Sequence, residues 1–133
     1  MNIENREVES VPERAKSGAF SRYVSNDIEQ HAQNMNGWEL CYDQLTPGSF
    51  KGELLEYREG GMQLMRDSTN QAMVKRGQAW AGAITFHVPL RLTGQAFCNG
   101  HVLNENILFV VRGSNLPDLR TPPCLDVLSV AIE

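Results

Sequence analysis

Short apolar segments separated by turn signals are the feature that most constrains how this chain can fold. After Gly37, segments rich in Leu, Val, Ile and Phe alternate with Gly- and Pro-containing turns. The turn signals stand at Pro47-Gly48, Gly60-Gly61, Gly77, Asn99-Gly100, Arg112-Gly113 and Thr121-Pro122-Pro123. Strands at this spacing are typical of all-β sandwiches and barrels. We predict strands near residues 38–44, 50–58, 62–69, 83–88, 95–98, 101–103, 107–111, 116–120 and 124–132.

The segment before Gly37 has a different pattern. Residues 1–24 are polar and follow no sustained hydrophobic period, which predicts an N-terminal arm that is partly flexible. Ser25-Asn26-Asp27 then offers three helix N-caps, and a capping box has the right spacing for Asn26 with Glu29 or Asp27 with Gln30. We expect a short helix from about Asp27 to Asn34, inside one folded domain that covers residues 25–133.

Composition and charge exclude several classes of protein. A chain of 133 residues with a hydrophobic fraction of 41% suits one globular domain. The net charge is −4, and phosphate contacts need a basic surface, so the composition argues against an autonomous nucleic-acid-binding domain. Lys75-Arg76 is too small a basic cluster to change this, and we interpret it as solvated. The longest apolar run, Ile107 to Val111, is too short to cross a bilayer.

The cysteines indicate a reducing compartment. Cys41, Cys98 and Cys124 are odd in number, far apart and without a C-x-x-C pair. These features favour reduced thiols in a cytoplasmic protein over a disulfide framework. Cys41 and Cys124 lie in apolar strand patterns, so we predict that they are small core residues.

Two hairpins can be paired residue by residue. A two-residue turn at Gly60-Gly61 predicts the pairs Leu54 with Asp67, Leu55 with Arg66, Glu56 with Met65 and Tyr57 with Leu64. Both faces of this hairpin are then mixed, which fits either a barrel with a partly polar interior or a longer loop with a shifted register. Asn99-Gly100 is the strongest turn signal and sets Cys98 opposite His101 and Phe97 opposite Val102. In segment 83–88, Ile84, Phe86 and Val88 face one way, and Ala83, Thr85 and His87 face the other.

No motif for catalysis, metal binding or a cofactor is present. The three histidines, His31, His87 and His101, form no H-x-H, and Cys98 with His101 would supply too few ligands for a metal. G-x-S-x-G, P-loop and G-x-G-x-x-G motifs are absent as well. We therefore expect no catalytic residues, no metal and no cofactor.

Asp126 interrupts the last apolar segment, and two interpretations of it stay open. An inward carboxylate must be paired, because an unpaired buried charge is costly. It is then either a pocket anion paired with an arginine such as Arg66 or Arg120, or a half-exposed residue at the end of a strand.

Three ordered motifs carry a resemblance to a known family. They are Y-D-Q-L-x-P-G-x-F-x-G from Tyr42 to Gly52, R-x-x-T-N-Q-A from Arg66 to Ala72, and L-R-T-P from Leu119 to Pro122. Over about residues 27–133 the chain resembles the N-terminal domain of AraC-family transcriptional regulators. The likeness is strongest to the group that includes the ethanolamine-operon regulator.

This resemblance implies a cupin-like, jelly-roll type β-barrel with a short N-terminal helix. It also implies a bacterial, cytoplasmic sensor without enzymatic activity, which binds a small-molecule effector and forms a homodimer. DNA would be bound by a C-terminal helix-turn-helix part, which these 133 residues do not contain. Rival hypotheses are a cupin-fold enzyme, such as a metal-dependent isomerase or dioxygenase, and an interaction module without a ligand.

The pocket candidates come from physical reasoning and not from the family. Ligands inside barrels are held by apolar and aromatic walls with a few polar groups. The residues that could supply such a lining are Arg66, Thr69, Trp80, Thr85, His87, Phe97 and Arg120.

Overall fold

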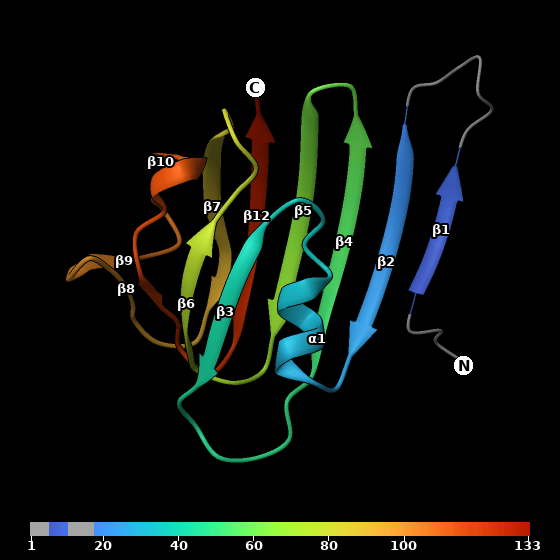
Figure 1. Cartoon of the computed structure of the whole chain (residues 1–133). Helices are drawn as coiled ribbons and strands as arrows, with labels where there is room; N and C mark the ends of the chain where they lie inside the picture. The colour runs from blue at the N-terminus through green and yellow to red at the C-terminus, as the bar shows by residue number, and fades with distance from the viewer. Residues whose placement is uncertain (1–5, 11–17) are drawn as a thin grey trace.

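The computed structural model describes residues 6–10 and 18–133, which form two antiparallel sheets and little helix (Figure 1). The larger sheet has the order β1 (Arg6–Ser10), β2 (Ala19–Ser25), β4 (Gly52–Glu59), β5 (Met62–Thr69), β12 (Leu125–Ile132), β7 (Ile84–Leu92) and β10 (Phe109–Arg112). The smaller sheet has the order β3 (Glu39–Gln44), β6 (Met73–Gln78), β11 (Leu119–Arg120), β8 (Ala96–Cys98) and β9 (His101–Leu103). Neither sheet closes on itself. The expectation of a mainly β chain is confirmed, and its strands form two antiparallel sheets.

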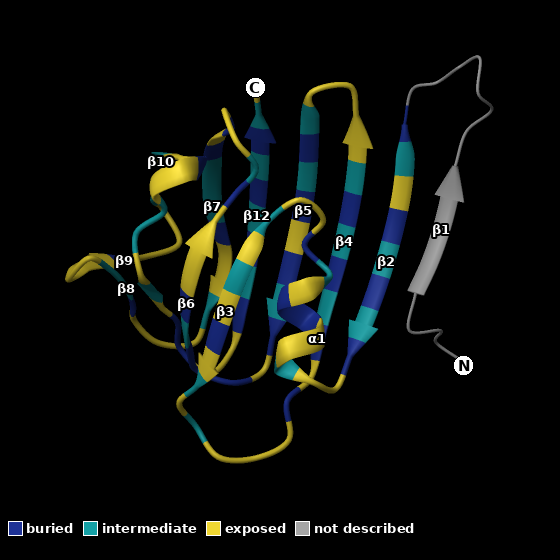
Figure 2. Ribbon diagram, viewed as in Figure 1, coloured by how far each residue is buried: buried dark blue, intermediate teal, exposed yellow. Residues whose placement is uncertain are grey.

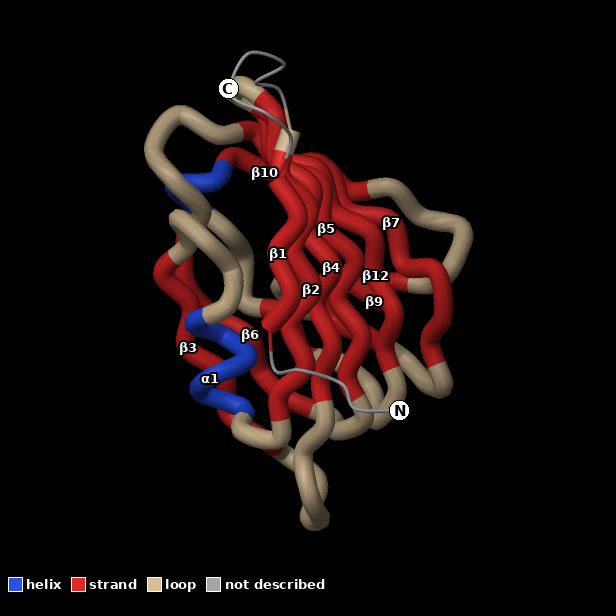
Figure 3. Tube along the Cα trace, turned by 90° about the vertical axis from the view of Figure 1, so that its right-hand side faces the viewer, coloured by secondary structure: helices blue, strands red, loops and turns tan. Residues whose placement is uncertain are grey.

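The smaller sheet and the helix form one layer over the inner face of the larger sheet. Helix α1 (Ile28–Gln33) contacts β2, β3 and β4, and it lies on the same side of the larger sheet as β3 and β6 (Figure 3). The 3-10 helix η1 (Gly113–Asn115) follows β10. Along β12 buried residues alternate with half-buried ones, and Figure 2 shows this alternation of inner and outer faces. The core therefore lies between the two layers.

The predicted short helix is confirmed, but its cap differs from a capping box. Asp27 is the N-cap, and its Oδ1 accepts a hydrogen bond from the N–H of Glu29 at 2.9 Å. The N–H of Asp27 donates to Oγ of Ser25 at 3.1 Å. The Gln30 side chain bonds Asn34 and does not return to Asp27. In a capping box, the side chain of the third helical residue accepts the hydrogen bond from the N–H of the N-cap residue. Here the Ser25 hydroxyl accepts that bond instead.

Both hairpin registers are confirmed. The four predicted pairs across Gly60-Gly61 occur, and Cys98 lies opposite His101 across Asn99-Gly100. The φ angles of Asn99 and Gly100 are 51° and 82°, as a two-residue hairpin turn requires. The inner face of β4 and β5 is mixed, because Leu54 and Met65 are buried there beside Glu56 and Asp67. The interior is therefore partly polar, and the register is not shifted.

Three of the described strands, β1, β2 and β6, were not predicted, and the last two were missed for a physical reason. Gly77, which was predicted to be in a turn, lies inside β6 opposite Leu40 with φ at +139°. A Cβ at this position would come within 2.0 Å of the carbonyl oxygen of Glu39, so this glycine marks a close approach of two backbones. In β2 the inward residues include Ser21 and Ser25, so no apolar period was visible.

The predicted N-terminal arm differs from the structure in the part that is described. β1 and β2 both pair in the larger sheet, so the boundary expected at residue 25 falls at the end of a sheet strand. Residues 1–5 and 11–17 of the predicted arm lie outside the described residues.

The prediction that Cys41 and Cys124 are core residues is wrong. Both are exposed free thiols: Cys41 is on the outward side of β3, and Cys124 precedes β12. Alternation along a strand decides which side a residue takes, and the apolar composition of the segment does not.

Candidate functional site

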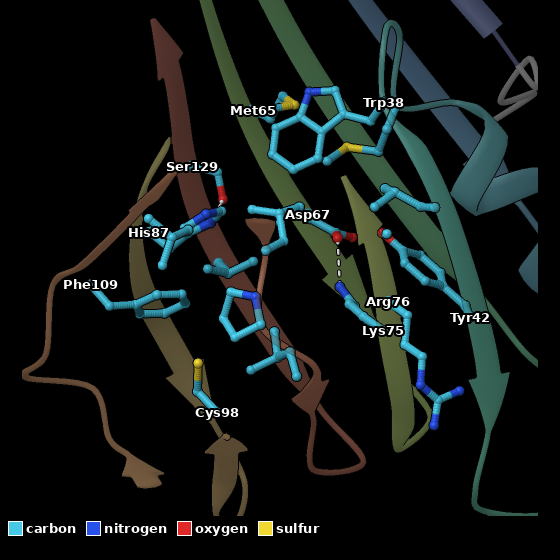
Figure 4. Close-up of a pocket in the computed structure, with 18 residues that line it drawn as sticks. Trp38, Tyr42, Met65, Asp67, Lys75, Arg76, His87, Cys98, Phe109 and Ser129 are labelled. Atoms are coloured by element: carbon cyan, nitrogen blue, oxygen red, sulfur yellow. Dashed lines mark hydrogen bonds and ion pairs between the residues drawn. The ribbon is translucent and has the colours of Figure 1, made fainter. Parts of the chain in front are cut away.

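A cavity between the two layers is the candidate site (Figure 4). Its lining comes from both sheets and from the loop after β10: Met35, Trp38, Leu40, Tyr42, Met65, Asp67, Lys75, Arg76, Gly77, His87, Cys98, Phe109, Val111, Leu116, Pro117, Leu119, Val127 and Ser129. Its volume is about 80 Å³, counted as the space that the centre of a water molecule can occupy. With a water radius added around a compact shape of that size, the space is roughly 280 Å³, near the lower limit of ligand pockets.

Aromatic rings form one wall of the cavity. The imidazole of His87 stacks on Phe109 with 4.7 Å between ring centroids and an interplanar angle of 19°. The indole of Trp38 meets His87 edge-on, with the centroids 6.4 Å apart. These rings come from β7, β10 and the segment before β3, and together they make this wall of the cavity aromatic and mostly apolar.

The hydrogen bonds of His87 fix which ring nitrogen carries the proton when the ring is neutral. Thr85 Oγ1 lies 3.2 Å from the carbonyl oxygen of Val111, to which it donates its single hydrogen. Oγ1 must then accept from Nε2 of His87, 2.9 Å away, which leaves Nδ1 to accept from the Ser129 hydroxyl at 2.8 Å. Burial, assisted by the charge of Lys75, lowers the pKa of His87 to about 4. His87 therefore serves as a neutral ring in the wall.

The His87 pKa predicts a dependence of stability on pH. An unfolded imidazole titrates near pH 6.5, so below that pH the unfolded state takes up the proton before the folded state does. We expect the wild type to lose about 2 kcal/mol relative to His87→Gln between about pH 6.5 and pH 4. Urea denaturation at pH 7.5, 5.5 and 4 measures the difference. His101→Gln, at an exposed site, is the matched control, and parallel curves for wild type and His87→Gln would contradict the prediction.

A buried charged cluster lies at the opposite wall and joins three elements. Oδ2 of Asp67 on β5 accepts from the Lys75 ammonium of β6 at 2.8 Å, and its Oδ1 pairs with Nε2 of His31 on α1 at 2.7 Å. The Lys75 ammonium also lies 5.0 Å from the centroid of the Tyr42 ring. Figure 4 shows Tyr42 and Lys75 reaching the cavity from the smaller sheet.

Electrostatics define the charge states in this cluster. Burial alone would raise the pKa of Asp67, but the charges of Lys75 and His31 and their hydrogen bonds outweigh it and hold the pKa well below its usual range. Burial, and then the charge of Asp67, raise the pKa of the Tyr42 phenol well above its usual value. Tyr42 is therefore a neutral hydroxyl, and Asp67 a carboxylate whose charge Lys75 balances.

A second polar network closes one end of the interior. Oε1 of Gln63 accepts from the indole N–H groups of Trp38 and Trp80 at 2.8 and 2.9 Å. Its Nε2 donates to Oε2 of Glu56 and to the carbonyl oxygen of Asn36. All four hydrogen-bonding positions of this buried amide are therefore used.

The structure brings one of the seven predicted pocket residues, His87, into the cavity lining. Thr85 is buried behind it and bonds its ring, whereas Trp80 bonds Gln63 outside the lining. Phe97 is half-buried in β8, and Arg120 is exposed on β11. The other two candidates lie outside the lining as well: Thr69 is buried with no partner for its hydroxyl, and Arg66 is on the outer face.

Asp126 lies outside the cavity, on the outer face of the larger sheet. Its carboxylate takes two hydrogen bonds from Arg66, at 3.0 and 2.6 Å, and one from Ser68 at 3.2 Å. The proposed partner Arg66 is confirmed, while the pocket interpretation is wrong. The register pairs Asp126 with Ser68, which places both on the outward side.

Sequence reasoning missed several site residues, among them Trp38, Asp67 and Lys75, and Lys75 shows the reason most clearly. It was interpreted as solvated with Arg76, but adjacent strand residues face opposite sides. Lys75 is buried, whereas Arg76 is exposed and bridges Asp43 and Asp118 at the surface. The alternation of β6 would have separated the two, had the strand been found.

The motifs behind the family resemblance hold loops together. Asn70 accepts from the N–H of Lys51 at 2.7 Å and donates to the carbonyl oxygen of Ser49 at 3.1 Å. Gln71 accepts from the Thr46 hydroxyl at 2.5 Å and donates to the same Ser49 carbonyl oxygen at 2.9 Å. These loop residues of the first two motifs are therefore partners in one clamp outside the cavity lining, whereas Tyr42 and Asp67, from the strand parts of the same motifs, belong to the lining.

Metal-ligand clusters, reactive thiols and membrane-spanning helices are further features that could indicate a function. Across residues 6–10 and 18–133, no three His, Cys, Asp or Glu side chains lie together where they could hold a metal ion. The thiol of Cys98 lines the cavity, and burial raises its pKa, so it is a thiol and not a thiolate. No helix in the described part is long and apolar enough to span a membrane.

Comparison with known proteins adds little to this description. No protein-family model matches the chain. Among solved structures, a conserved protein of unknown function from Pseudomonas aeruginosa PAO1 superposes with a TM-score of 0.47 at 12% sequence identity. The match covers 84% of this chain and 57% of that one, so the chain spans less than two thirds of that protein's length.

Proposed function

We propose that this chain is a small-molecule-sensing domain of the kind found in AraC-family transcriptional regulators, and that its effector binds between the two sheets. The motif resemblance over about residues 27–133 supports this assignment. Two facing antiparallel sheets are compatible with the cupin-like barrel that the resemblance implies. In such a regulator, DNA recognition would belong to a separate helix-turn-helix part, in keeping with the net charge of −4 here.

The cavity with its two unlike walls is the observation that carries the proposal. His87 uses both ring nitrogens within the protein and offers a ligand only its aromatic surface. The opposite wall offers the Lys75 ammonium, which has N–H groups beyond the one that bonds Asp67, and the Tyr42 hydroxyl. The site therefore suits a flat, mostly apolar molecule of roughly ten to fifteen non-hydrogen atoms that carries one hydrogen-bond acceptor, such as a carbonyl, hydroxyl or carboxylate.

The same geometry connects the cavity to the rest of the fold. A ligand that accepts a hydrogen bond from Lys75 competes with Asp67 for the same ammonium. Asp67 also holds His31, so a change at Lys75 reaches α1 through two side-chain contacts. A ligand acts in this way only if it binds the two arrangements of the cluster with different affinity.

A thermal-shift screen of flat carbonyl, hydroxyl and carboxylate compounds tests the proposal. A ligand at about 100 times its Kd should add roughly 2.7 kcal/mol to the free energy of unfolding. Each hit is then measured against Val111→Phe, which fills the cavity, and Val110→Phe, the matched control one residue away on the outer face.

We expect Val111→Phe to weaken binding at least about tenfold and Val110→Phe to leave it unchanged, with the intrinsic tryptophan fluorescence as the second readout. Equal binding by the two variants, or a screen without any stabilising compound, would count against the cavity as an effector site.

A further inference from the structure

The charges around the cavity limit the charge that a ligand can carry. The titratable residues of the lining are Tyr42, Asp67, Lys75, Arg76, His87 and Cys98. Burial raises the pKa of the Tyr42 phenol and of the Cys98 thiol, and it lowers the pKa of the His87 imidazole, so these three groups are uncharged at neutral pH. Only the other three carry a charge.

The charge of Arg76 is neutralised at the surface. Its Nη1 donates to Oδ2 of Asp43 at 3.0 Å, and its Nε donates to Oδ2 of Asp118 at 3.2 Å. The side chain is 51% exposed, and Figure 4 shows its guanidinium pointing away from the pair formed by Lys75 and Asp67. A solvated guanidinium between two carboxylates is screened, so Arg76 does not supply a counter-ion for a ligand.

Lys75 and Asp67 balance each other inside the protein. Their ion pair is 2.8 Å long, and the two side chains are 10% and 6% exposed. His31 bonds Asp67 through Nε2, and its buried Nδ1 has no hydrogen-bond partner in the described part of the chain, so a second proton would leave an unpaired N–H there. An imidazole takes up that proton in acid, and it is then that the charge of His31 acts on Asp67. At neutral pH the cluster is therefore uncharged as a whole.

A ligand that binds Lys75 must share its ammonium with Asp67. Two oxygen atoms that accept from one tetrahedral ammonium, each at the 2.8 Å of the Asp67 bond, lie about 4.6 Å apart. If the ligand oxygen belongs to a carboxylate, two like charges meet at that distance with one buried cation between them, and their repulsion is weakly screened there. A carbonyl oxygen accepts the same hydrogen bond without bringing a charge out of water.

We infer that this cavity selects an uncharged aromatic carbonyl compound and rejects a carboxylate of the same shape. The inference rests on the proposed function, because it names the class of effector for the same cavity. The hydrogen bond from Lys75 is available to both kinds of compound, so it does not discriminate between them. The selectivity comes from the Asp67 carboxylate, which repels a second negative charge.

Isothermal titration calorimetry of the 133-residue chain at about pH 7.5 tests the inference with compounds of matched shape. Acetophenone is compared with benzoate, and 2-acetonaphthone with 2-naphthoate, so that a methyl group replaces one carboxylate oxygen. We expect each ketone that binds to have a Kd at least about tenfold below that of its carboxylate. Carboxylates that bind as tightly as the ketones would overturn the inference and leave the cavity as the effector site. If none of the four compounds binds, the inference and the proposed effector site both fail.

Asp67→Asn should reverse this preference, because it removes the repelling charge and leaves the Lys75 ammonium to pair with the ligand. We expect 2-naphthoate to bind this variant more tightly than 2-acetonaphthone, and to raise its melting temperature more than that of the wild type. Asp126→Asn is the matched control, because it removes the same charge from an ion pair on the outer face and should keep the wild-type preference. Circular dichroism verifies that each variant is folded, and the wild-type comparison decides the inference without them. A folded Asp67→Asn that still prefers the ketone would also overturn it.

Discussion

Replacing Asp67 with asparagine is expected to lower the free energy of unfolding by about 3–5 kcal/mol at pH 7, because removing one partner of a buried ion pair strands the other. Asp67 is the acceptor for both Lys75 and His31, and its side chain is 6% exposed. Asparagine keeps the shape but removes the charge, so the Lys75 ammonium remains buried without a counter-ion. The substitution also weakens the one side-chain junction between α1, β5 and β6 described above.

The loss of unfolding free energy in Asp67→Asn should become smaller as the pH falls. An unfolded aspartate titrates near pH 3.9, while Lys75 and His31 hold the pKa of folded Asp67 well below that value, against the opposing effect of burial. A lowered folded pKa means that the carboxylate stabilises the fold fully above about pH 4 and loses this effect as the pH falls further. The gap between wild type and Asp67→Asn should therefore narrow below about pH 4.

Urea denaturation at pH 7 and at pH 3 measures both parts of this prediction. Asp118→Asn is the matched control: Asp118 also forms an ion pair, with Arg76, but its side chain is 64% exposed, and such pairs contribute about 0–1 kcal/mol. The double variant Asp67→Asn with Lys75→Met should recover part of the loss, because it removes the stranded charge. If Asp67→Asn costs no more than Asp118→Asn, the cluster does not stabilise the fold.

The substitution Gln63→Leu should have the second-largest effect, a loss of about 3 kcal/mol. Leucine has a similar volume but offers no hydrogen bond. The indole N–H groups of Trp38 and Trp80 lose their acceptor, and Glu56 loses a donor inside the protein. Buried polar groups left unpaired cost about 1–3 kcal/mol each, and the half-buried indoles regain part of this from water.

Equilibrium unfolding with Trp fluorescence as the probe checks this expectation. Gln78→Leu is the matched control, because Gln78 is exposed on β6 and its amide makes one surface hydrogen bond, to Glu39. Gln63→Glu separates the two halves of the network. It keeps the acceptor for both indoles but puts a second carboxylate beside Glu56, so its loss should shrink in acid. Equal costs for Gln63→Leu and Gln78→Leu would show that this network is dispensable.

Features that depend on neighbouring residues could be predicted from the sequence. The turns at Gly60-Gly61 and Asn99-Gly100 set the register of their hairpins, because a two-residue turn leaves one way to pair the flanking strands. Clean alternation in segment 83–88 put His87 on the same face as Ala83 and Thr85, and the structure turns that face inward, which brings His87 into the cavity lining. The Asp27 cap likewise acts within three residues of the chain.

The rest of the site arises from contacts between distant parts of the chain. Asp67 meets His31 across 36 positions, and Arg66 meets Asp126 across 60, so neither pair has a local signal. Lys75 faces inward because it lies in β6, which pairs with β3 and β11. Gly77 was interpreted as a turn residue, so β6 was not predicted. A mainly β chain, two hairpin registers and the shared face of Thr85 and His87 follow from local sequence patterns. Which faces turn inward and which charges meet follow from the fold, because both depend on how the two sheets are stacked.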